Sequence, residues 1–268
     1  MLWLMALVLC LQEPKTGEKS TVTFGSTLEL ETVVRDGKGE TARLLNLTRK
    51  EKFTQTQMDA KTVKIECVSS SLQKSGSDTP IEEKPTALAG QAFFATRTES
   101  GWTVKDLDGG APPNEGQNLG AWNDVGRLLP ASGEPKTGDK WTVEGKDLLP
   151  LVFPTSIREA TGKFECSCES ADGGKANIVF VGEITGKGKD EGQTLIKFSV
   201  KTGRLTYDLG KKKPASVLMS GSFESTTDMV DIIRKPGTGA NIGNDEERRK
   251  VGEISVKSKK LEVEISFE

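Results

Sequence analysis

The chain has 268 residues, with 37 basic and 39 acidic side chains, four cysteines and no histidine. This length is enough for one large domain or two smaller ones that bury a core without disulfides. A net charge of -2 gives no field that would attract nucleic acid, so we expect no nucleic-acid partner. The absence of histidine excludes Ser-His-Asp and Cys-His nucleophilic sites. We predict no catalytic set, cofactor or metal, and an enzyme would have to rely on carboxylates, lysine or cysteine.

The chain begins with an uninterrupted apolar run over residues 1 to 11, which ends at Gln12. Such a run is too short to span a bilayer but is typical of the hydrophobic region of a signal peptide. We therefore predict an exported protein, periplasmic or extracellular. Two alternatives stay open: a lipid anchor at Cys10, which would be the one source of membrane contact, and an N-terminal strand buried in the core.

Strand patterns follow the leader. Residues 27 to 34 alternate, with Leu28, Leu30, Thr32 and Val34 on one face and polar side chains mostly on the other. Turn residues then separate similar runs as far as Leu107. These patterns predict antiparallel strands joined by short connections.

Residues 109 to 133 interrupt this pattern. Asn114 and Gln117 resemble the capping pair of a helix start, and Pro130 is a stop signal. We predict one amphipathic helix at about 114 to 129, with Trp122 as its largest anchor on a sheet. The apolar side chains that recur at about helical spacing are Leu119, Trp122, Val125 and Leu129.

Strand patterns resume after residue 134 and continue to the C-terminus. Their spacing is typical of an antiparallel meander. The last segment, residues 252 to 267, carries polar residues in its middle, from Ser258 to Lys260. This pattern predicts a C-terminal hairpin that turns at those residues.

A ten-residue stretch occurs twice. Residues 13 to 22 read EPKTGEKSTV and residues 134 to 143 read EPKTGDKWTV, so the copies differ at two positions. Such near identity without gaps indicates an internal duplication, and each copy predicts a turn that leads into a strand. We therefore predict a mainly β fold with two related curved antiparallel sheets, arranged as a half-barrel or a sandwich. The first half is 12 to 133, with the helix, and the second is 134 to 268.

Three cysteines remain if the leader is removed: Cys67, Cys166 and Cys168. Three interpretations stay open for them. They could be small buried apolar residues, Cys67 could form a disulfide with one of the other two, or the three thiolates could join a carboxylate around a metal. Separately, residues 106 to 110 begin like a calcium loop but lack the later bidentate glutamate, so we expect a plain turn there.

The second half opens with a short motif. Leu128, Leu129 and Pro130 precede Gly138-Asp139-Lys140-Trp141. In this element and in its layout the chain resembles secreted or lipoprotein β-sheet proteins of environmental bacteria, in which a short leader precedes two β halves. The resemblance implies an exported location and a β fold, and no activity. The layout is also similar to the curved half-barrels that carry lipids or lipoproteins through bacterial envelopes.

The leader, the β pattern and the lack of histidine together predict an exported, non-enzymatic envelope protein. A concave sheet surface would bind an apolar ligand or an envelope protein as partner. The alternative is a carboxylate-dependent hydrolase with its site between the two halves. An apolar-lined concavity would favour the first interpretation, and convergent carboxyl groups with a raised pKa would favour the second.

Overall fold

The computed structural model describes residues 16–77, 79–99, 101–117, 119–147, 157–188, 195–234 and 246–268. The predicted leader, residues 1 to 11, lies outside this part of the chain. Within these ranges, no helix is both long enough and apolar enough to cross a membrane.

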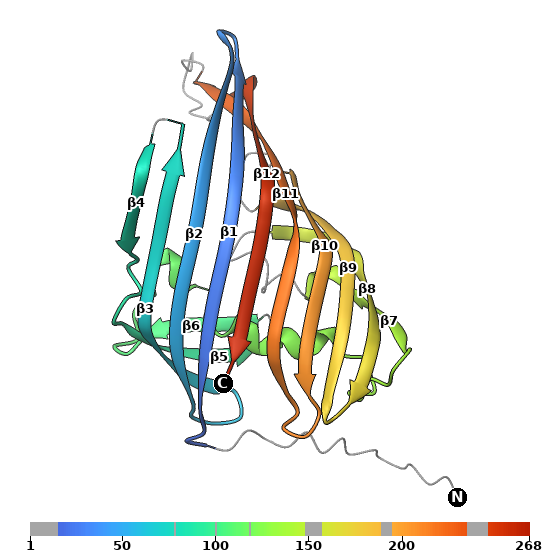
Figure 1. Cartoon of the computed structure of the whole chain (residues 1–268). Helices are drawn as coiled ribbons and strands as arrows, with labels where there is room; N and C mark the ends of the chain where they lie inside the picture. Colours follow the sequence, from blue (N-terminus) through green and yellow to red (C-terminus); the bar gives the residue numbers. More distant parts are fainter. Residues whose placement is uncertain are drawn as a thin grey trace, which may run out of the picture.

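Twelve strands form one antiparallel sheet that does not close on itself (Figure 1). The strands are β1 (Lys19–Asp36), β2 (Gly39–Gln57), β3 (Thr62–Gly76), β4 (Thr79–Pro85), β5 (Ala92–Thr98), β6 (Gly101–Asp106), β7 (Lys140–Glu144), β8 (Ile157–Asp172), β9 (Lys175–Gly188), β10 (Leu195–Asp208), β11 (Lys213–Arg234) and β12 (Glu246–Phe267). Their order in the sheet is β6-β5-β3-β2-β1-β12-β11-β10-β9-β8-β7, with β4 paired to β3 beside this row. The first and last long strands are therefore neighbours at the centre.

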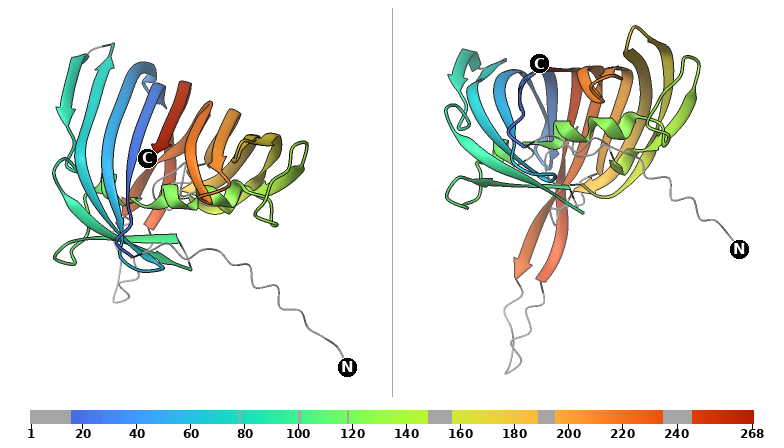
Figure 2. Two further views of the ribbon diagram at one scale, coloured as in Figure 1. Left: turned by 60° about the horizontal axis from the view of Figure 1, so that its bottom comes forward. Right: turned by 90° about the horizontal axis from the view of Figure 1, so that it is seen from below.

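The predicted fold class, mainly β with curved antiparallel strands, is confirmed. The sheet arches over a helical segment that crosses one of its faces (Figure 2). Strands from both predicted halves join in a single sheet, because β1 pairs with β12 from Val22 opposite Phe267 to Asp36 opposite Gly252. The division of the chain at residue 134 stays a prediction.

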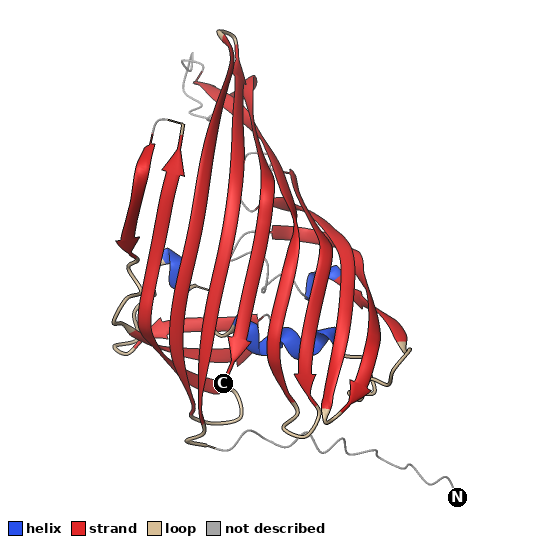
Figure 3. Ribbon diagram, viewed as in Figure 1, coloured by secondary structure: helices blue, strands red, loops and turns tan. Residues whose placement is uncertain are grey.

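The helical region lies where the sequence predicts it, but it is interrupted. Two 3-10 helices, η1 (Asn114–Gly116) and η2 (Ala121–Leu128), take the place of one continuous helix (Figure 3). A third short 3-10 helix, η3 (Gly145–Asp147), follows β7. Gly120 has a φ of 93°, and a Cβ there would lie 3.0 Å from the Trp102 ring. This left-handed residue, pressed against the sheet, separates η1 from η2.

The two copies of the repeated stretch have similar local structure in the part that is described, which starts at Thr16. Gly17 and Gly138 both have positive φ, 84° and 89°. The Gly17 amide donates to the Gln57 carbonyl at 2.7 Å, and the Gly138 amide donates to the Cys168 carbonyl at 2.8 Å. Each turn is thus hydrogen-bonded to a neighbouring strand, β2 or β8, and leads into β1 or β7. Their surroundings differ, since β1 has neighbours on both sides and β7 pairs only with β8 in the described sheet.

The predicted C-terminal hairpin is wrong, because β12 runs through Ser258 to Lys260 as one strand. The register against β1 shifts there: Lys260 lies opposite Glu29, and Ser258 lies opposite Leu30. Lys259 is the extra residue of a β-bulge. The bulge changes the parity of the strand, so that Val256 before it and Leu261 after it face the same side of the sheet. In the sequence alone, this break in the alternation of apolar and polar residues resembles a turn.

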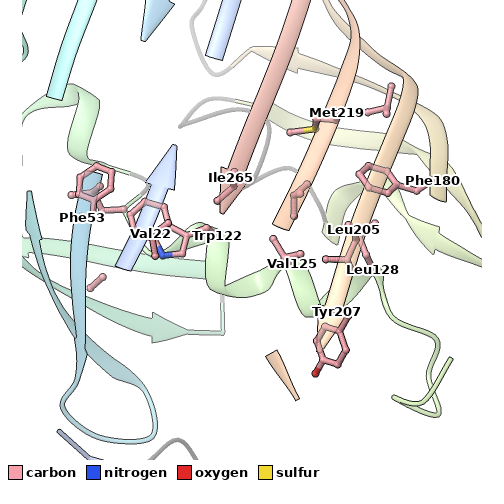
Figure 4. Close-up of a cluster of buried hydrophobic side chains, with 14 of the residues drawn as sticks. Val22, Phe53, Trp122, Val125, Leu128, Phe180, Leu205, Tyr207, Met219 and Ile265 are labelled. Carbon is pink, nitrogen blue, oxygen red and sulfur yellow. The ribbon is translucent and has the colours of Figure 1, made fainter. Parts of the chain in front are cut away.

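The core lies between the sheet and η2, and we call this side of the sheet the inner face. Figure 4 shows Val22, Phe53 and Ile265 from the central strands gathered around Trp122 and Val125 of η2. All five are buried, as are neighbouring side chains on β9, β10 and β11. The opposite side, the outer face, carries the alternating polar side chains of the same strands.

Candidate functional site

The η2 helix covers one end of the inner face and is fixed by Trp122. The Trp122 ring stacks on Phe53, with ring centroids 5.1 Å apart. Its Nε1 donates to Gln55 Oε1 at 2.9 Å, and Asn123 Nδ2 donates to the same oxygen at 3.0 Å. The Gln55 amide donates back to Asn123 Oδ1 at 3.0 Å. Apolar contact and hydrogen bonding therefore hold this helix in one position on β2.

A buried carboxylate adds a second attachment. Asp124 of η2 has a side chain that is 1% exposed, with Arg97 Nη2 of β5 at 3.1 Å and Arg127 Nη2 at 3.4 Å. Because the carboxylate is removed from water, the two opposite charges compensate for its burial. The ion cluster links η2 to the β5 side of the sheet.

Beyond η2, the inner face carries an apolar surface that we call the inner apolar strip. Leu28 and Leu30 are an even number of residues from the buried Val22 on β1, so they face the same side, the inner face. Leu28 lies opposite both Leu47 and Leu261, and Leu30 lies opposite Leu45, so these residues share that face. Its members are half-buried: Leu28, Leu30, Leu45, Leu47, Leu72, Phe223, Val256 and Leu261. Among the described residues, only Leu261 of this set packs against the buried core. The strip therefore adjoins the core at Leu261, and its other members lie outside the core.

A polar cluster marks the boundary between the strip and the helical end. Arg49 lies opposite Ser26 of β1 and Leu72 of β3, one inner position away from Leu47. Its Nη2 is 2.7 Å from Glu51 Oε1, and the buried Glu51 also accepts a hydrogen bond from Ser70 at 2.7 Å. These charged groups are compensated within the protein.

A groove of about 810 Å³ lies on the outer face. Most of its lining residues are at outer-face positions, as Leu218 is between the buried Val217 and Met219; the lining also includes residues at inner-face positions, among them Met219 and Arg49. A second hollow of about 390 Å³ shares Val179 and Val181 with it and extends toward β7. The two hollows together cross most of the sheet on the side away from η2.

The outer groove has a mixed lining. Leu218 and Val181 are exposed at 45% and 43%. They stand beside Glu262 and Glu264 of β12 and beside Arg204, which pairs with Glu169 at 2.7 Å. An apolar ligand placed here would remove these charged groups from water at a cost. The inner apolar strip has fewer charged neighbours: Lys74 lies opposite Leu47, and Arg43 and Arg49 lie at its two ends on β2.

The carboxyl groups with shifted pKa values are stabilised as anions. Hydrogen bonds from the Lys61 amide and from the Lys64 ammonium lower the pKa of Asp59 and of Glu66. The Lys197 ammonium likewise lowers the pKa of Glu183. Such groups lose their protons more readily than usual, which suits ion pairing and does not suit a general acid at neutral pH.

The three cysteines are free thiols and are buried. Cys67 is on β3 and Cys166 and Cys168 are on β8, in opposite arms of the sheet. The disulfide interpretation is therefore wrong, and the apolar interpretation holds. Burial raises the pKa of Cys166 to about 12, and burial together with the Glu51 carboxylate raises the pKa of Cys67 to about 11.

This burial predicts a pH dependence of stability. Because the folded-state pKa of Cys166 is raised from 9.0 to about 12, its contribution is complete below pH 9 and is lost as the pH rises toward 12. At pH 10.5 the loss from this thiol is about 2 kcal/mol. Urea unfolding of the wild type and of Cys166→Ala at pH 8 and pH 10.5 should show the smaller decrease in the variant. Equal decreases in both proteins would contradict the assignment.

The predicted turn at residues 106 to 110 is confirmed. The Asp106 carboxylate accepts hydrogen bonds from the amides of Asp108, at 3.0 Å, and Gly110, at 2.7 Å. The carboxylate thus closes its own turn. In the described ranges, no three Cys, Asp or Glu side chains lie close enough together to hold a metal ion.

Comparison with known proteins finds only weak structural similarities to this chain. No protein-family model and no curated protein matches the sequence. A lipovitellin structure described for its lipid–protein interactions aligns over 95% of this chain with 9% identity and a TM-score of 0.44, and the alignment spans only 25% of the lipovitellin chain. An outer membrane lipoprotein-sorting protein domain from Vibrio parahaemolyticus aligns over 88% of this chain and 84% of its own, with 11% identity and a TM-score of 0.15.

A chain from work on the asymmetric conductivity of engineered proteins aligns over 92% of this chain and 99% of its own. Its identity is 10% and its TM-score is 0.19. At such low scores these likenesses establish neither a shared function nor a shared site. The functional conclusion depends on the residues of this chain.

Proposed function

We propose that this protein binds an apolar ligand, an acyl chain of a lipid or lipid-like molecule, on the inner apolar strip. The observation that carries the proposal is the register of Leu28 with Leu47 and Leu261, which assembles apolar side chains from three adjacent strands on one face. These side chains are only half-buried, so a ligand would remove further apolar area from water at about 25 cal/mol per Å².

The shape of the sheet favours a slender ligand over a protein partner. The strip lies on the face that the sheet arches over, with η2 across one end (Figure 2). At about 3.3 Å per residue, the stretch of β1 from Leu28 to Thr32, which lies opposite Val256, is about 13 Å long, which suits an extended chain.

We further propose that the protein works outside the cytoplasm. The support is the apolar run over residues 1 to 11, which is typical of a signal peptide. An exported protein with an apolar binding face suits the transport or storage of lipids in a bacterial envelope. The mass of the mature protein would show whether the leader is removed or whether Cys10 carries a lipid.

A pair of double variants tests the binding site. Leu28 and Leu47 are opposite neighbours on the inner face, and Thr27 and Thr48 are opposite neighbours on the outer face one position away. We expect Leu28→Gln with Leu47→Gln to weaken the binding of methyl dodecanoate about tenfold or more, because two apolar contacts are lost. Displacement of a neutral fluorescent dye would measure the affinity.

The matched control is Thr27→Gln with Thr48→Gln, which should bind within about twofold of the wild type. Both threonines line the outer groove. If the threonine variant loses affinity and the leucine variant keeps it, the ligand occupies the outer groove and the proposal is wrong. Thermal unfolding of both variants shows whether either substitution disturbs the fold.

A further inference from the structure

Arg49 stands at the polar end of the inner apolar strip. On β2 its inner-face neighbours are Leu47 on the side of the strip and Glu51 on the side of the helix. Across the sheet it lies opposite Ser26 and Leu72. Any chain lying on the leucines and extending toward η1 would meet this guanidinium.

The protein holds the Arg49 guanidinium in place. Its Nη2 is 2.7 Å from Glu51 Oε1 and donates to the Glu115 carbonyl of η1 at 3.4 Å. Glu51 is fixed in turn by the Ser70 hydroxyl, which also lies 2.5 Å from the Thr86 hydroxyl. The position of the arginine is therefore set by β2, β3 and η1 together, without a ligand.

One N–H donor of this guanidinium has no hydrogen-bond acceptor among the described residues. Arg49 Nε is buried and has no hydrogen-bond partner in the part of the chain that is described. A buried N–H without an acceptor is costly, and an acceptor from outside the protein would reach it after a small shift of the groups that cover it. Arg49 lies opposite Leu72 of the strip, and an unpartnered donor at this position suits the oxygen at the polar end of an acyl chain.

We propose that Arg49 Nε donates a hydrogen bond to a neutral carbonyl oxygen, so that the ligand is an ester or amide of an acyl chain and not a free fatty acid. The proposal rests on the proposed function and adds the chemical class of the ligand. The charge of Arg49 is already balanced by Glu51 at 2.7 Å. A carboxylate ligand would place a second negative charge beside the buried Glu51, which is unfavourable.

The test compares dodecane with methyl dodecanoate, which share a long alkyl chain and differ in the ester group. We expect the wild type to bind the ester more tightly than dodecane, and Arg49→Lys to reduce this preference about tenfold with dodecane binding unchanged. Lysine keeps the positive charge for Glu51 and lacks the Nε–H. The control is Arg43→Lys on the same strand, which lies opposite Thr32 at the other end of the strip.

The outcomes separate this inference from the proposed function. If the wild type binds neither compound, the apolar site itself is wrong. If it binds both and Arg49→Lys keeps the full preference for the ester, a water satisfies Nε–H and the role of Arg49 is wrong. Tighter binding of dodecanoate than of methyl dodecanoate at pH 8 would also overturn the choice of a neutral acceptor. Thermal unfolding of Arg49→Lys checks that the fold is intact.

Discussion

Replacing Trp122 with alanine is expected to lower the free energy of unfolding by about 3–5 kcal/mol, as for other large aromatic side chains removed from a core. The ring is only 7% exposed and stacks on Phe53, so its loss leaves a cavity between η2 and β2. The substitution also removes the donor to Gln55 Oε1. Urea unfolding followed by circular dichroism would measure the change.

Trp122→Phe is the matched variant, because it keeps an aromatic ring over Phe53 and removes the indole N–H. We expect a loss of about 1–3 kcal/mol, from the smaller ring and the lost hydrogen bond to Gln55. A Trp122→Ala protein within about 1 kcal/mol of the wild type would show that η2 is not anchored to the sheet as described.

Replacing Gly162 with alanine is expected to destabilise the protein by about 2–5 kcal/mol, from backbone strain and steric overlap together. Gly162 has a φ of 126°, and a Cβ there would lie 2.0 Å from the Glu183 carbonyl oxygen of β9. That oxygen belongs to the backbone of a paired strand, so it cannot move away without disturbing the ladder between β8 and β9. Unfolding in urea would again report the loss.

Gly25→Ala is the control for this prediction. Gly25 also lies within a long strand, but its φ is not in the left-handed region and a Cβ there would meet no atom within 4 Å. We expect its stability to stay within about 0.5 kcal/mol of the wild type. Similar losses in both variants would mean that glycine matters in these strands for a reason other than close backbone approach.

Much of the fold could be predicted from sequence because alternation is a direct consequence of strand geometry. Leu28 and Leu30, and likewise Leu45 and Leu47, are two residues apart in runs that form β1 and β2. The bulge at Lys259 was not predictable in the same way. A single inserted residue changes the parity of a strand, and polar residues at that point resemble a turn.

The helical region shows another limit of sequence periodicity. The spacing of Leu119, Trp122 and Val125 marks an apolar face correctly, and all three are buried. It does not show that Gly120 adopts a left-handed conformation, because the reason lies in its contact with Trp102 on β6. Tertiary packing, and not local propensity, decides where η2 begins.

The candidate site was harder to predict from sequence than the fold, because it is defined by contacts in the tertiary structure. Alternation identifies the leucines of the inner apolar strip, but only the register shows that Leu28, Leu47 and Leu261 meet. Arg49 and Glu51 look like ordinary polar strand residues in the sequence. Their importance follows from the buried position of Glu51 and from the contact with η1, which joins residues 49 and 115.

The most direct test of the inner apolar strip as a ligand site is photo-crosslinking with an acyl ester that carries a diazirine on its chain. Peptide mass spectrometry would then locate the labelled residues. We predict labels on β1, β2 and β12 around Leu28, Leu47 and Leu261, suppressed by an excess of unlabelled methyl dodecanoate. Labelling concentrated at Leu218 and Val181 of the outer groove would contradict the proposal.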